Sequence, residues 1–132
     1  MTRIAIFLCL LFVAASTTAC SAKLKADLNV DDAKFELSGC RSGQVYGFRG
    51  VELKGKSGGK IRLVAGASGE AKAFFMASGT KTAIDMGKCG PFSVNSQKST
   101  INGVTNVEGK ATLDCKGGGH TVKGTVSFSN CH

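Results

Sequence analysis

The stretch from Lys110 to Ser129, KATLDCKGGGHTVKGTVSFS, decides the fold class of this chain. Apolar residues alternate with polar residues on both sides of three consecutive glycines. A period of two places the apolar side chains on one face of a strand, and Gly-rich links are typical of the turn between paired strands. The stretch therefore predicts an antiparallel β-hairpin with one buried face.

The same alternation recurs along the chain ahead of this hairpin. Its apolar members are Leu24 to Val30, Phe35 and Leu37, Val51 and Leu53, Ile61 to Ala65, Ala71 to Phe75, Ile84 and Met86, and Phe92 and Val94. Short Gly-containing segments separate these runs, and no run keeps a helical period for three turns. The sequence therefore predicts an all-β fold, a small antiparallel sandwich or barrel of about eight to ten short strands.

The composition limits the chain to one domain. Its 132 residues leave no room for two cores, and a hydrophobic content of 42% argues against disorder. The 18 glycines follow no three-residue period, which excludes collagen, and all of them lie at Gly39 or later. We therefore expect a single β domain over residues 24–132.

Residues 1–19 are predicted to be a signal peptide. Arg3 precedes twelve apolar residues, IAIFLCLLFVAA, and small residues follow this run. A helix of that length spans ~18 Å, well short of the ~30 Å hydrocarbon core of a bilayer. The segment is therefore expected to be a removed leader and not a retained membrane span.

The end of the leader, Thr17-Thr18-Ala19-Cys20, resembles the lipobox of bacterial lipoproteins. The resemblance implies cleavage after Ala19, acylation of Cys20 and a short lipid-anchor tether over residues 20–23. Thr17 stands where that family usually has Leu. Ordinary cleavage after Ala22, which would also remove Cys20, is the alternative.

The cysteine count agrees with both cleavage sites, provided that Cys20 is either acylated or lost. Five cysteines follow Ala19, and in an oxidising compartment an odd number leaves one thiol unpaired unless lipid consumes it. Cleavage after Ala22 leaves an even four. We expect the acylated form, and we expect the remaining four cysteines to form two disulfides.

Strand geometry narrows the pairing of these cysteines, Cys40, Cys89, Cys115 and Cys131. In the hairpin, Cys115 is expected to face residues 120–121, and Cys131 lies about ten residues further on, ~30 Å along a strand. Because a disulfide tolerates only ~4.4 to 6.8 Å between Cα atoms, a Cys115–Cys131 bridge is disfavoured. Of the two remaining pairings we favour Cys40 with Cys131 and Cys89 with Cys115, which ties the last strand to an early one.

The chain is basic, with 17 Lys plus Arg against nine Asp plus Glu. Removing Arg3 with the leader changes the formal charge from +8 to +7, so anionic lipid headgroups or acidic glycans are expected partners beside the membrane. An envelope protein is a further candidate partner. The lysines are scattered singly, as on a solvated β surface, and an exported protein is not expected to bind nucleic acid.

Two motifs that suggest cofactor or metal binding fail on their context. Residues 50–57, GVELKGKS, match the phosphate-binding P-loop, but that loop needs a following helix and here another strand is predicted. Cys115, His120, Cys131 and His132 are capable of binding metal, but zinc would need the two cysteines reduced outside the cytoplasm. We therefore expect neither a cofactor nor a metal.

No catalytic constellation is evident. GASG at residues 66–69 is one residue short of the G-x-S-x-G nucleophile motif and is typical of a turn. His120 and Asp114 are close across the predicted hairpin, but such a pair is usually a surface pair. The acidic residues alternate with lysines on faces expected to be exposed. We therefore predict no catalytic residues and do not expect an enzyme.

Aromatic and basic residues are interleaved at Tyr46-Gly47-Phe48-Arg49. This segment is too short for a nucleic-acid platform. Tyr46, Phe48, Arg49 and the nearby Arg41 are the residues we expect to line a binding patch, although an alternating Tyr and Phe are more often core residues.

The body of the chain is also similar to mycobacterial surface lipoprotein antigens, in the segment Ile101 to Thr105 and in a final strand that ends at Cys131. No functional residue is carried over from that similarity. Together these observations predict an exported, lipid-anchored protein of the bacterial cell envelope, at the outer membrane or cell surface, that acts as a binding module. The alternatives are a small inhibitor of a hydrolase, presenting a rigid loop such as Gly55 to Lys60, and an enzyme with an unrecognised site.

Overall fold

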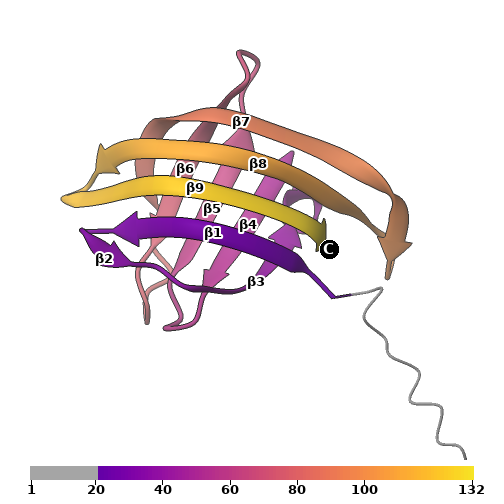
Figure 1. Cartoon of the computed structure of the whole chain (residues 1–132), viewed down its shortest axis with the longest axis horizontal. Helices are drawn as coiled ribbons and strands as arrows, with labels where there is room; N and C mark the ends of the chain where they lie inside the picture. Colours follow the sequence, from indigo (N-terminus) through magenta and orange to yellow (C-terminus); the bar gives the residue numbers. More distant parts are fainter. Residues whose placement is uncertain (1–20) are drawn as a thin grey trace, which may run out of the picture.

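The computed structural model describes residues 21–132, so the predicted signal peptide and the acylation site Cys20 lie outside the described residues. Within residues 21–132 the chain forms nine strands and one short 3-10 helix, η2 (Figure 1). The elements are β1 (Lys23–Val30), β2 (Ala33–Lys34), β3 (Leu37–Ser42), η2 (Gly43–Tyr46), β4 (Gly50–Gly55), β5 (Lys60–Ala65), β6 (Glu70–Met76), β7 (Ile84–Ile101), β8 (Val104–Gly117) and β9 (His120–Cys131). The predicted all-β class is confirmed. Over residues 21–132 no helix is long and apolar enough to cross a membrane.

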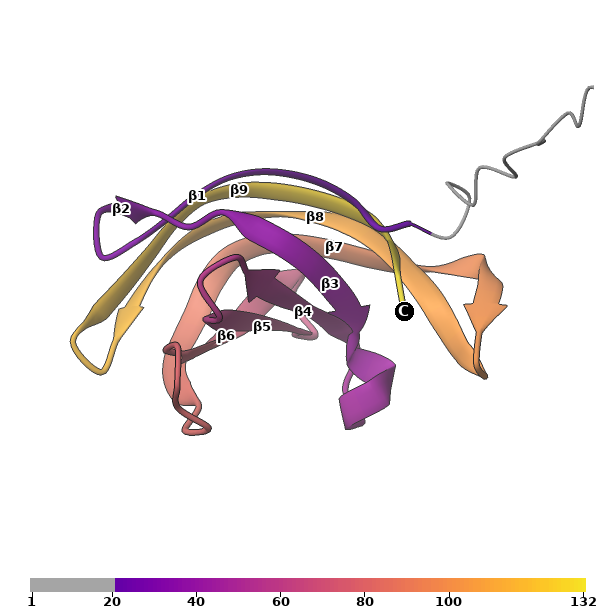
Figure 2. The same ribbon diagram turned by 90° about the horizontal axis from the view of Figure 1, so that it is seen from below.

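All nine strands belong to one antiparallel sheet with the order β2-β1-β9-β8-β7-β6-β5-β4-β3. The sheet curls into a half-barrel, so that β1, β9, β8 and β7 arch over β3 to β6 (Figure 2). The first strand therefore lies beside the last one, and each remaining strand from β3 to β8 pairs with the next along the chain.

The strand β7 joins the two layers. Its first half pairs with β6 as far as Pro91, and its second half pairs with β8 from Phe92 onward. Gly87 and Gly90 lie in the first half with positive φ angles of 69° and 123°, beside the register shifts between β6 and β7. Glycine adopts such angles without the steric penalty of a Cβ, so the strand turns from one layer into the other without ending.

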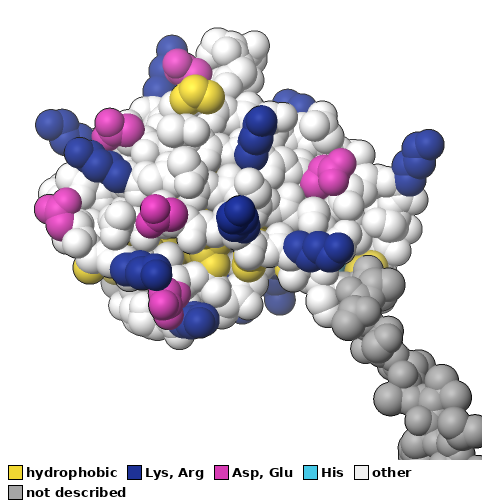
Figure 3. Space-filling model, in the orientation of Figure 1, with side chains coloured by type: hydrophobic (Ala, Val, Ile, Leu, Met, Phe, Trp, Pro, Cys, Tyr) yellow, Lys and Arg dark blue, Asp and Glu magenta, His cyan; other side chains and the backbone are white. Residues whose placement is uncertain are grey.

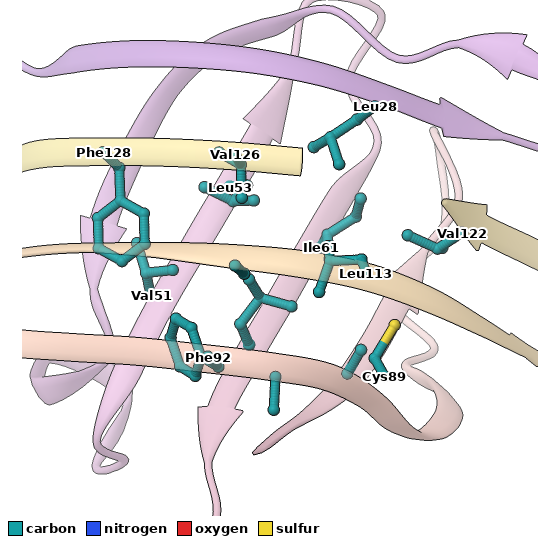
Figure 4. Packing of buried hydrophobic residues seen from close by; sticks show 14 of the residues in the cluster. Leu28, Val51, Leu53, Ile61, Cys89, Phe92, Leu113, Val122, Val126 and Phe128 are labelled. Atoms are coloured by element: carbon teal, nitrogen blue, oxygen red, sulfur yellow. The ribbon is translucent and has the colours of Figure 1, made fainter. Parts of the chain in front are cut away.

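The hydrophobic core fills the space between the two layers (Figure 4). Val51, Leu53 and Ile61 point inward from β4 and β5, and side chains of β8 and β9 face them, among them Leu113 and Val126. These are the apolar members of the alternating runs, so the predicted inward face is confirmed. On the outer face of the arch, basic and acidic side chains are interspersed (Figure 3).

Two disulfides close the fold with the favoured pairing. Cys40 on β3 is bonded to Cys131 on β9, with Cα atoms 5.2 Å apart, and Cys89 on β7 is bonded to Cys115 on β8, with Cα atoms 4.7 Å apart. The expected register of the last hairpin is wrong by one residue, because Cys115 lies opposite Val122.

The reason for that shift is the size of the β8–β9 turn. Gly118 and Gly119 have φ angles of 58° and 83°, and Gly117 pairs with His120. Two central residues with positive φ form the two-residue turn that fits the twist of paired strands. Gly117 therefore belongs to β8 and not to the turn.

Candidate binding site

The short helix η2 turns the chain from β3 into β4. The hydroxyl of Ser42 accepts a hydrogen bond from the amide of Gln44 (3.3 Å), which caps the start of η2. Gly47 ends the helix with a φ of 84°, and its amide donates to the carbonyl of Gln44 (3.2 Å). The Phe48 ring packs against Gly43 so closely that a Cβ on Gly43 would lie 2.5 Å from it. The segment is therefore held in one conformation from both ends.

This conformation exposes Val45 and Tyr46. The two side chains are 43% and 38% exposed, and within residues 21–132 they are the only large hydrophobic side chains exposed to this degree. Buried apolar surface is stabilising, so the exposed parts of this adjacent pair add nothing to the core and form a surface available for contact.

The carboxylate of Glu52 lies beneath Tyr46 and is fully buried. Glu52 stands between the core residues Val51 and Leu53 on β4, so its side chain points away from the core. Its Oε1 accepts a hydrogen bond from the Tyr46 hydroxyl (2.9 Å), and its Oε2 accepts one from Nε of Arg62 (2.7 Å). The burial of this charge is thus offset by two directed hydrogen bonds.

Arg62 closes the cluster from β5. Its guanidinium carbon lies 4.1 Å from the centre of the Tyr46 ring, within the range of a cation–π contact. Lys60 approaches Glu52 more distantly, with Nζ 3.9 Å from Oε1. Arg41 on β3 is the cross-strand neighbour of Glu52 and is exposed. We name Arg41, Tyr46, Glu52, Lys60 and Arg62 the Glu52 cluster.

A cleft of about 290 Å³ adjoins η2 on the side that faces β7 and β8. Phe48 and Arg49 line it together with Val94. The Phe48 ring stacks on Tyr46, with ring centres 6.3 Å apart and planes 14° apart, and Nη2 of Arg49 donates a hydrogen bond to the carbonyl of Val94 (2.8 Å). The aromatic pair therefore links the Glu52 cluster to the cleft.

The structure brings the four residues of the predicted binding patch to this one region. Tyr46, Phe48 and Arg49 follow one another around η2, and Arg41 reaches the region through its neighbour Glu52. That the patch binds a ligand stays a prediction. Sequence reasoning missed Glu52, which was expected to be exposed, and it missed Arg62. The part that these two residues take in the site becomes visible only from the pairing of β3, β4 and β5.

His120 does not pair with Asp114 as the hairpin predicted. Asp114 lies opposite Lys123, and Nδ1 of His120 lies 2.6 Å from Oδ2 of Asp31 in the turn after β1. The hydrogen bond from His120, and then that from the amide of Thr121, lowers the pKa of Asp31 below its ordinary value. Both side chains are partly exposed, which fits a surface pair.

The remaining chemical motifs take structural positions. In the P-loop match, residues 50–55 are strand β4 and the next element is strand β5, so the turn between them does not lead into a helix. Cys115 and Cys131 of the metal-capable group belong to two different disulfides, so neither offers a thiolate. The expectation that the protein is not an enzyme stays a prediction.

The β4–β5 turn is the loop that an inhibitor would present. The amide of Gly55 donates to the carbonyl of Gly59 (2.7 Å), and the hydroxyl of Ser78 donates to the carbonyl of Ser57 (2.8 Å). The ring of Phe35 lies against both glycines. The turn is thus held rigidly, and its role as an inhibitory loop stays a prediction.

Comparison of the chain with protein families, with curated proteins and with solved structures finds no match.

Proposed function

We propose that the protein is an exported, lipid-anchored binding module of the bacterial cell envelope, and that the Glu52 cluster with η2 binds an acidic group of its ligand. The observation that carries the proposal is the buried carboxylate of Glu52 beneath an exposed tyrosine and a partly exposed arginine. Well-packed hydrophobic residues in place of a buried ion pair are often equally stabilising. The cluster therefore adds little to stability, and its effect is to hold Tyr46 and Arg62 in fixed positions at the surface.

An acidic ligand is favoured by the charges around η2. Of the three guanidinium nitrogens of Arg62, only Nε donates to Glu52 in the described part of the chain, which leaves the two terminal nitrogens for a ligand. Arg41 and Lys60 flank the same position, and the one carboxylate among them is buried. A guanidinium held in advance loses less conformational freedom when it binds a carboxylate or phosphate.

The cysteines support the export and the anchor. The two disulfides are consistent with a protein that folds in an oxidising compartment. They use all four cysteines of residues 21–132, so a retained Cys20 finds no free thiol within the folded domain. Together with the lipobox resemblance, this supports acylation of Cys20. Intact-mass measurement of the mature protein tests it, and a mass equal to residues 23–132 without an acyl increment would contradict it.

The binding proposal is tested by NMR titration of the isotope-labelled protein with two acidic probes, an oligogalacturonate and glycerol phosphate. We expect chemical-shift changes confined to η2 and the Glu52 cluster. Arg41→Gln should weaken these changes, and the matched control Lys123→Gln, an exposed cation on β9, should not. Changes spread evenly over both layers, or none at η2 with either probe, would contradict the proposal.

A further inference from the structure

The strand directions bring four segments to one end of the molecule. β1 begins there, β9 ends there, and the β7–β8 turn and η2 lie at the same end (Figure 2). Asn130 connects the first of these segments to the second, because its Nδ2 donates to the carbonyl of Ser21 (3.2 Å). The neighbouring Cys131 is bonded to Cys40, two residues before the cap of η2. We name residues 21–25, 40–49, 95–108 and 129–132 the tethered end.

The acylation site adjoins this end without a free linker. Cys20 directly precedes Ser21 in the sequence, and consecutive Cα atoms are about 3.8 Å apart. Because Ser21 is already bonded to β9, an acyl group on Cys20 enters the bilayer beside the folded surface. An anchor of this kind sets which end of the domain lies nearest to the lipid.

The tethered end also carries the two features that favour contact with a bilayer. Val45 and Tyr46 are its exposed hydrophobic side chains, and a tyrosine is common where a protein meets the lipid headgroups. Its side chains include five basic residues and one acidic residue, Glu108; the basic ones are Lys23, Lys25, Arg41, Arg49 and Lys98. In the described chain none of these five lies within 4.0 Å of a carboxylate.

The opposite end has a different character. Four acidic residues lie in its turns or close to it, Asp31, Asp32, Asp85 and Asp114. Lysines are interspersed with them, among them Lys34, Lys116 and Lys123. Acidic side chains are repelled by anionic lipid, whereas basic side chains within a Debye length are attracted to it. The excess of basic over acidic side chains is therefore at the tethered end, whereas the opposite end carries both signs.

We propose that the tethered end rests on the surface of an anionic membrane, with Val45 and Tyr46 among the headgroups and the basic side chains facing lipid phosphates. This inference rests on the proposed function. It identifies the acidic ligand of the proposed site as the lipid phosphates of the membrane that holds the anchor. The acyl group holds the domain at the bilayer, and a basic, partly apolar surface beside it adds attraction that favours one orientation. The domain is therefore oriented on the membrane, because only the tethered end carries both the anchor and the basic, partly apolar surface.

The chain provides its own probe for this contact, since Tyr46 is its single tyrosine and it has no tryptophan. The acylated protein is reconstituted into phosphatidylcholine vesicles that contain phosphatidylglycerol, with bromine atoms on the acyl chains near the headgroups. We expect Tyr46 emission to fall about twofold relative to unbrominated vesicles, as for a side chain at the headgroup boundary. The matched control Lys116→Trp places a fluorophore on exposed β8 at the opposite end, and its emission should not change.

The outcomes separate this inference from the proposed function. Quenching of both fluorophores, or of neither, in an acylated protein overturns the orientation and leaves the binding proposal standing. If the mature mass shows no acyl group, the same two proteins are mixed with free vesicles. The inference is then supported if only Tyr46 is quenched and if this quenching requires phosphatidylglycerol. Lys98→Gln should in addition weaken the affinity for these vesicles about fivefold. A response of Tyr46 to oligogalacturonate but not to vesicles assigns the site to an acidic glycan and overturns it.

Discussion

Replacing Arg62 by methionine should destabilise the protein strongly, because it leaves the Glu52 carboxylate buried without its cation. The bond that is lost is short, 2.7 Å from Nε to Oε2, and Glu52 is 0% exposed. Breaking one partner of a buried pair typically costs about 3 to 5 kcal/mol. We expect the lower value, about 3 kcal/mol, because the Tyr46 hydroxyl still donates to Oε1 and Arg62 itself is partly exposed. For a domain of this size the midpoint of thermal unfolding should fall by about 12 °C.

The control and the double variant separate this cause from a general loss of charge. Lys56 pairs with Glu36 at 3.5 Å, but both side chains are more than half exposed, so Lys56→Met should cost less than about 1 kcal/mol. Glu52→Met combined with Arg62→Met should recover most of the loss, since it removes the buried charge together with its partner. Urea unfolding followed by circular dichroism gives the free energies, read from midpoints at constant slope. If Arg62→Met costs no more than Lys56→Met, or if the double variant is as unstable as the single one, the argument from buried charge is refuted.

Three further perturbations have definite outcomes. Replacing Cys40 and Cys131 by alanine removes a disulfide that spans 91 residues and should lower the free energy of unfolding by about 4.6 kcal/mol. Removing the Cys89–Cys115 disulfide, which spans 26 residues, should cost about 3.5 kcal/mol. Urea unfolding measures both, and equal costs would contradict a dependence on loop length. Gly50→Ala should cost about 3 kcal/mol or more, because φ at this position is 153° and a Cβ would overlap a carbonyl oxygen of β5; an unchanged unfolding midpoint would disprove that crowding. The pKa of Asp31 is lowered, so the ionised Asp31 stabilises the folded protein at pH values above its ordinary pKa of 3.8. This stabilisation is lost as the pH falls through the lowered pKa. The wild-type protein should therefore lose stability in acid relative to Asp31→Asn. Unfolding midpoints measured along a pH series check this, and parallel curves for the two proteins would rule out a role for the His120 contact.

The fold class could be predicted because burial on one face of a strand leaves a local record in the sequence. Leu113 and Val126 alternate with polar residues whatever strands lie beside them, so the inward face is legible without the sheet order. The disulfides were accessible only in part, since distance along a strand disfavours Cys115 with Cys131 before any tertiary contact is known but leaves two pairings open.

The extent of the strands was less accessible. The sequence shows two separate apolar runs where the structure has the single strand β7, because Gly87 and Gly90 interrupt the alternation while the backbone continues. The outer half of β7 projects beyond the core and pairs with β8 without burying a regular apolar face, so residues 95–101 carry no periodic signal.

The centre of the site could not be predicted from a local pattern. Glu52 occupies the polar position of an alternating strand, where exposure is the ordinary outcome. It is buried because Tyr46 from η2 and Arg62 from the neighbouring strand cover it. No pattern in the sequence around Glu52 indicates either contact. The interleaved aromatic and basic residues at Tyr46 to Arg49 did indicate the region, because their composition is unusual for a strand or a turn of this chain.

The pairing of β1 with β9 has a consequence for the order in which the molecule is assembled. β1 is matched to β9 over its whole length, from Lys23 opposite Ser129 to Val30 opposite Val122, so its main partner is synthesised about 100 residues later. Until β9 emerges, β1 has only the two-residue strand β2 beside it, and the Cys40 thiol has no partner at Cys131. An N-terminal fragment therefore cannot complete the fold. For a protein that we propose to be exported, we expect this dependence on β9 to delay folding until β9 has crossed the membrane.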